Sequence, residues 1–67
     1  MAYAKLRGLI REKFKTQGAF AKAMGINPTT LSKKLSGQVD WTRKEIEKAC
    51  NLLEIPANQI FDYFFTL

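Results

Sequence analysis

The chain has 67 residues, of which 46% are hydrophobic and 25% charged, and its formal net charge is +5. This length allows one small domain, and the composition is typical of a folded chain rather than a disordered one. No apolar run reaches the ~18 residues of a membrane span, the charged N-terminus lacks a signal-peptide pattern, and the one cysteine excludes an internal disulfide. We therefore expect a single cytoplasmic domain over residues 1–67.

Apolar residues at helical spacing predict a first helix over residues 3–14 and a second over residues 17–24. Lysines and arginines fill the remaining positions of the first helix, so we assign them to its solvated side. Gly8 weakens that helix by about 1 kcal/mol relative to alanine, which suggests that a neighbouring element packs closely there. Thr16 can cap the second helix, and Gly25 ends it because glycine takes a positive φ without steric cost.

The third predicted helix is barely two turns long. Asn27 is its expected N-cap, Pro28 suits its first position, and Gly37 closes it. Leu31 and Leu35 lie four residues apart and should face the core. A helix this short is not stable alone, so its neighbours must hold it in place.

The fourth and fifth helices follow from local signals. In "WTRKEI", Thr42 and Glu45 form a capping box, and the helix after it has an apolar face formed by Ile46, Ala49, Cys50 and Leu53. Pro56 can open a fifth helix over residues 57–64, and we expect Ile60, Phe61 and Phe64 to complete the core. Phe65 and Leu67 are candidates for a homodimer interface, because so small a domain cannot bury every aromatic side chain. The expected fold is all-α with five short helices.

The residue types present argue against catalysis and metal binding. The chain has no histidine, which removes His-based acid–base and nucleophilic chemistry, and one cysteine without histidine gives no zinc site. No glycine-rich phosphate loop follows a strand, and the six acids are scattered. We expect neither an enzyme nor a cofactor.

Basic residues are concentrated in the first part of the chain. Residues 1–38 contain eight Lys or Arg and one acid, whereas residues 39–67 contain three Lys or Arg and five acids. Nucleic acid or an acidic protein is the partner that such a basic half attracts. For any single lysine, solvated surface charge remains the alternative.

The second and third helices, joined by residues 25–27, have the layout of a helix-turn-helix over about residues 17–36. The stretch "TQGAFAKAMGINPTTLSKKLSG" resembles the lambda-repressor-like (Cro/cI-type) helix-turn-helix family, and "EIEKACNLLEIP" is similar to the fourth helix of that family and the turn after it. The resemblance implies a compact five-helix DNA-binding domain, close to short phage or prophage Cro-like regulators, in a bacterial host.

The resemblance also implies roles for particular residues. Base readers would be Pro28, Thr29, Ser32 and Lys33. Phosphate contacts would be Thr16, Gln17, Asn27, Lys34 and Ser36. Proline at the first position departs from the family pattern and leaves only an apolar contact there. Every one of these residues also has a plain structural reading as a cap or an exposed helix residue.

These implications give a leading hypothesis and two alternatives. The leading one is a sequence-specific transcriptional regulator that binds operator DNA as a homodimer through the helix at 28–36. The second is a small protein-binding modulator, antirepressor-like, whose partner is a phage repressor. The third is an antitoxin or a DNA-coating protein.

Overall fold

The structure is a computed structural model that describes residues 3–65, and these residues form five α-helices and one 3-10 helix, without a strand. In chain order the elements are α1 Ala4–Phe14, α2 Gln17–Met24, α3 Pro28–Leu35, α4 Arg43–Leu53, η1 Ala57–Gln59 and α5 Ile60–Phe64. The expected all-α fold of five helices is confirmed. The fifth helix differs in detail, because its first turn is 3-10.

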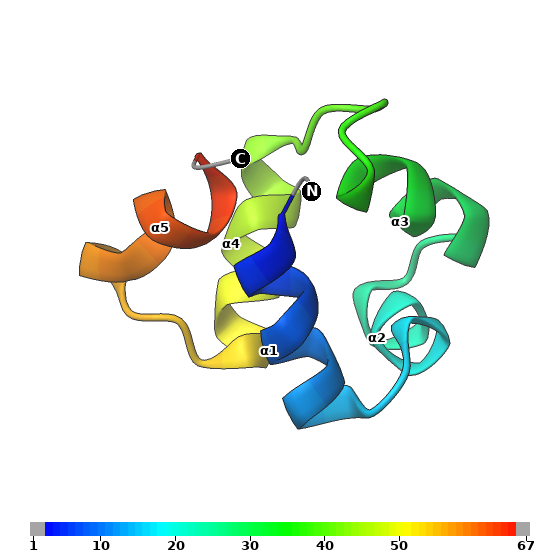
Figure 1. Cartoon of the computed structure of the whole chain (residues 1–67), viewed down its shortest axis with the longest axis horizontal. Coiled ribbons are helices and arrows are strands. Elements are labelled where there is room, and N and C mark those ends of the chain that lie inside the picture. The colour runs from blue at the N-terminus through cyan, green and yellow to red at the C-terminus, as the bar shows by residue number, and fades with distance from the viewer. Residues whose placement is uncertain (1–2, 66–67) are drawn as a thin grey trace.

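The helices surround one core in which α1 and α2 make most of the connections. α2 packs against α1, α3 and α4, and α1 also packs against α4 and α5. Figure 1 shows α1 in front of α4 at the centre, with α2 and α3 on one side and α5 on the other. The pair α2 and α3 and the C-terminal helix α5 therefore lie at opposite sides of the molecule.

Residues from all five α-helices fill the core. Its buried members are Leu6, Ile10, Phe20, Ala21, Met24, Leu31, Leu35, Ala49, Cys50, Leu53, Ile55 and Phe64. Leu31 and Leu35 fix α3, as expected, and burying each contributes about 2 kcal/mol. This burial offsets the weak intrinsic stability of an eight-residue helix.

Side-chain caps begin α2 and α3, and a glycine ends α2. The Thr16 hydroxyl accepts a hydrogen bond from the Ala19 N–H at 3.1 Å, and the Asn27 side chain accepts one from the Thr29 N–H at 2.8 Å. Gly25 ends α2 with φ 76°. These predicted caps are confirmed, and they set the direction in which α3 leaves the turn.

Two expectations about packing are wrong. Phe61 does not complete the core, since it is 65% exposed, while Phe64 of the same short helix is 3% exposed and points inward. Gly8 does not mark a close neighbour, because a Cβ placed there would meet no atom within 4 Å. The space beside Gly8 is open.

Trp41 links the segment before α4 to both ends of the described chain. Its ring lies edge-on to Phe64 at 5.1 Å and to Tyr3 at 6.4 Å between ring centroids. Such edge-to-face contacts add about 1 kcal/mol each beyond the buried area. They hold α5 and the start of α1 against the same point.

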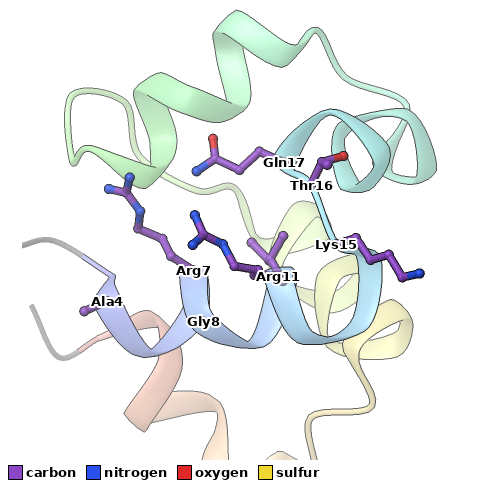
Figure 2. Close-up of a pocket in the computed structure, with 8 residues that line it drawn as sticks. Ala4, Arg7, Gly8, Arg11, Lys15, Thr16 and Gln17 are labelled. Carbon is purple, nitrogen blue, oxygen red and sulfur yellow. The ribbon is translucent and has the colours of Figure 1, made fainter.

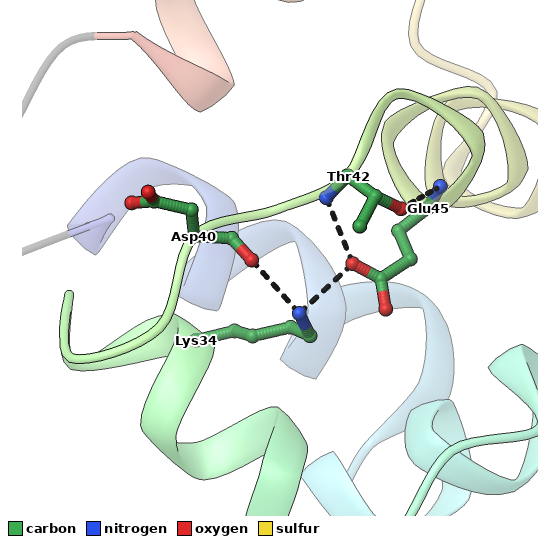
Figure 3. Close-up of polar contacts among 4 residues, drawn as sticks. All are labelled: Lys34, Asp40, Thr42 and Glu45. Carbon is green, nitrogen blue, oxygen red and sulfur yellow. Dashed lines mark hydrogen bonds and ion pairs between the residues drawn. The ribbon is translucent and has the colours of Figure 1, made fainter.

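Lys34 joins α3 to the beginning of α4. Its side chain is 5% exposed, and its Nζ lies 2.9 Å from the Asp40 carbonyl oxygen and 2.9 Å from Glu45 Oε1 (Figure 3). The same Oε1 accepts the Thr42 N–H at 2.9 Å, and the Glu45 N–H donates to the Thr42 hydroxyl at 3.2 Å. The capping box is confirmed, and Lys34 is built into it.

The pKa of the Glu45 carboxyl reflects these contacts. Burial alone would raise it, but the hydrogen bonds from the Thr42 N–H and the Lys34 ammonium, together with the charge of Lys34, bring the pKa below its ordinary value of 4.5. The ionised form of Glu45 is therefore the form that stabilises the fold.

Lys34→Met keeps the length of the side chain and removes its charge, which leaves the Glu45 carboxylate without a cation in a partly buried position. We expect the free energy of unfolding in urea to fall by about 1–3 kcal/mol. Lys33→Met is the matched control, because Lys33 is the exposed neighbour on the same helix. Equal stabilities of the two variants would contradict the assigned role of Lys34.

Glu45→Gln tests the same contact through pH. Because the folded-state pKa is lowered, the stabilisation is fully present above the unfolded-state value of 4.5 and is lost as the pH falls through the folded-state value. The difference in free energy of unfolding between wild type and Glu45→Gln should shrink from about pH 5 downward. Urea denaturation at several pH values measures it, and a constant difference down to pH 3 would contradict the assignment.

Candidate functional site

The side chains predicted to read DNA bases lie together on the outer side of α3. Pro28, Thr29, Ser32 and Lys33 are all exposed, while the two leucines of this helix point to the core. The structure thus brings the predicted readers onto one surface. Their contact with bases stays a prediction.

The predicted phosphate contacts have local structural roles. Thr16 and Asn27 cap α2 and α3, and the Ser36 hydroxyl donates to the Lys33 carbonyl at 3.0 Å. All three residues are exposed, and Gln17, at the start of α2, is half-buried. The caps explain Thr16 and Asn27 without DNA, so their phosphate contacts also stay predictions.

Lys34 requires a correction. The family resemblance predicts that Lys34 contacts a phosphate, but its ammonium is buried against Asp40 and Glu45 and is not free to reach a ligand. Lys33 is then the exposed cation that α3 offers. Electrostatic affinity for DNA grows with the number of phosphates neutralised, so α3 by itself contributes little of it.

A groove of about 660 Å³ runs along α1 to the start of α2, and sequence reasoning missed it. It is lined by Ala4, Arg7, Gly8, Ile10, Arg11, Lys15, Thr16 and Gln17. Figure 2 shows Arg7 and Arg11 rising from α1 on the same side, toward the Gln17 amide, whereas the Lys15 ammonium points away from them. The groove is therefore a basic recess with two guanidinium groups at its edge.

A signal for this groove is present in the sequence. Arg7 and Arg11 are four residues apart, so they lie on one side of a helix, and Ala4 and Gly8 repeat the same spacing with almost no side chain. From the sequence alone, these arginines are predicted to lie on the solvated side of the first helix. The recess between them depends on where α2 packs, which the spacing alone does not predict.

Aromatic side chains are exposed at the other side of the molecule. The rings of Phe61 and Phe65 stack with centroids 5.8 Å apart, and the two residues are 65% and 57% exposed. Leu67, the second residue of the expected dimer interface, lies outside the described residues. A homodimer through this surface stays a prediction.

Within residues 3–65, no group of three or more His, Cys, Asp or Glu side chains is placed to hold a metal ion. Cys50 is buried, and burial raises the pKa of its thiol, which keeps it in the less reactive protonated form. No helix in the same range is long and apolar enough to cross a membrane. Among the surfaces that residues 3–65 offer to a partner are those of α3, of the basic groove and of α5.

The chain is similar to a solved phage protein. The solution structure of the modulator of repression of the temperate bacteriophage TP901-1 from Lactococcus lactis superposes with a TM-score of 0.84 and is 45% identical in sequence. The match covers 96% of this chain and 86% of that chain. No curated protein matches the chain significantly.

The sequence also matches one protein family along its whole length. The family is described as "Protein of unknown function (DUF739)", and its model aligns with residues 1–67. The chain therefore belongs to the DUF739 family.

Proposed function

We propose that this chain is a modulator of a phage repressor, which binds the repressor protein and changes how much of the operator DNA the repressor occupies. The observation that carries the proposal is the 45% identity to a phage modulator of repression over 96% of the chain. The similarity extends well beyond a shared fold, since the two sequences agree at almost every second position. This proposal is the protein-binding alternative considered for the sequence.

The surface of α3 supports a protein partner rather than DNA as the main target. Base readout depends mostly on long polar side chains that form two hydrogen bonds to one base. At the exposed positions of α3 the chain has Pro28, three short hydroxyl side chains (Thr29, Thr30 and Ser32) and Lys33, and its other lysine is buried. Such a surface makes few base contacts.

Operator binding by the chain itself is a second candidate function. The exposed Thr29, Ser32 and Lys33 on a helix-turn-helix, together with the net charge of +5, favour it. In that case the chain would act as a Cro-like repressor and would need a dimer to reach two successive major grooves. The two candidates differ in whether the chain recognises operator DNA without the repressor.

Fluorescence anisotropy with a labelled operator duplex separates the two functions. The repressor comes from the phage genome that encodes this chain. We expect the chain to change the apparent Kd of the repressor for the operator by at least about tenfold, which corresponds to ~1.4 kcal/mol. Without the repressor, the chain should bind operator and scrambled duplexes equally. An operator preference of ~10³-fold by the chain alone would support the second candidate instead.

The double variant Thr29→Ala with Lys33→Ala removes two predicted base readers from α3. If the chain acts through the repressor, its effect on repressor occupancy should stay within about threefold of wild type, well under the ~1.4 kcal/mol of a tenfold change. Circular dichroism would verify that the variant is folded, as expected for exposed positions. Loss of the effect in a folded variant would contradict this prediction.

A further inference from the structure

We infer that the basic groove along α1 binds an acidic segment of a protein partner, with carboxylates paired to Arg7 and Arg11. The inference rests on the proposed function, because the partner meant is the repressor, and it names the surface of this chain that the repressor contacts. Three observations carry it: the arginine charges, the open space beside Gly8, and the mixed chemistry of the groove.

The two arginines lack an acidic partner inside the described chain. Four other cations have one: the ion pairs are Lys5–Asp62, Lys13–Glu54, Lys34–Glu45 and Arg43–Glu47. Within residues 3–65 no ion pair or hydrogen bond is formed by the side chains of Arg7 or Arg11, although Arg7 is only half exposed. Two guanidinium groups on one edge of a recess form a strong attractive site for carboxylates.

Gly8 lines the groove and contributes no side chain to it. In the middle of a helix, glycine is less stable than alanine, and here a Cβ would meet no atom of the chain within 4 Å. The packing of this chain therefore does not require glycine. A side chain at position 8 would instead occupy the space between Ala4 and the two arginines, which is the space that a bound segment needs.

The chemistry of the recess favours a protein segment over a DNA backbone. Ala4, Gly8 and the carbon stems of the arginines provide apolar surface next to the charges. An acidic helix or strand carries both apolar and carboxylate groups, and arginine binds a carboxylate through two parallel hydrogen bonds. A row of phosphates would pair with the two guanidinium groups but would make no contact with the apolar surface next to them.

The test measures affinity for two probes by isothermal titration calorimetry. One probe is the repressor from the phage genome that encodes this chain, and the other is a synthetic helical peptide with glutamates four residues apart. Arg7→Glu with Arg11→Glu is compared with Lys22→Glu plus Lys44→Glu, which makes the same change in net charge at exposed positions outside the groove. We expect the groove variant to lose about 100-fold or more in affinity for the repressor and the control to lose less than about threefold.

Gly8→Ala is the second variant and does not change any charge. We expect its melting temperature to rise by a few degrees, since alanine favours the helix, while its affinity for the repressor falls by about tenfold because the methyl group occupies the groove. Damage to the fold would lower the melting temperature. A higher melting temperature together with a lower affinity for the repressor therefore cannot be explained by misfolding. Unchanged repressor affinity in Gly8→Ala and in the double arginine variant would overturn the inference.

The two probes separate this inference from the proposed function. If wild type binds the repressor and the groove variants bind it equally well, the proposed function stands and the groove assignment is wrong. If wild type binds the acidic peptide through the groove and ignores the repressor, the groove is an acidic-segment site and the proposed function is wrong. If the groove variants keep their affinity for both probes and lose only binding to the scrambled duplex of the anisotropy experiment, the groove contacts phosphates and the inference is overturned.

Discussion

The position of α3 depends on Lys34, a cation placed where a core residue would be expected. Leu31 and Leu35 hold the inner side of this short helix, and Lys34 connects it to the start of α4 through Asp40 and Glu45. Glu45 already serves the capping box of α4. One carboxylate therefore fixes the beginning of α4 and the orientation of α3 together. As a consequence, one of the two lysines of α3 is buried, and its charge is not available for contact with DNA.

The burial of this lysine changes how the basic half of the chain is understood. Residues 1–38 contain eight cations and one acid, and from the sequence alone this excess of positive charge favours a surface that binds nucleic acid or an acidic protein. In the structure these charges are divided among different surfaces: Lys34 is internal, Lys33 lies on α3, and Arg7 and Arg11 line a groove on α1. Among the described residues these charges are therefore not gathered around α3. This distribution supports the proposed action on a repressor, and the similar phage protein is named a modulator of repression.

The features that could be predicted from the sequence are those decided by neighbouring residues. Caps at Thr16, Asn27 and Thr42 and the glycine turn at Gly25 depend on a few adjacent positions, and the structure confirms them. Features decided by packing between distant segments could not be predicted. The sequence does not say that Lys34 meets Glu45, that α5 turns Phe61 outward, or that α2 leaves a recess beside Gly8. Helical periodicity assigns a residue to a side of its helix, and only the packing decides what that side meets.

We propose that this chain recognises a repressor protein through the groove on α1 and not operator DNA through α3. An NMR titration of the isotopically labelled chain with the unlabelled repressor tests it most directly, because each backbone amide reports its own environment. The account predicts that the largest shift changes fall on Arg7, Gly8, Arg11 and Gln17. Changes confined to α3, or no change with the repressor and strong changes with an operator duplex, would contradict it.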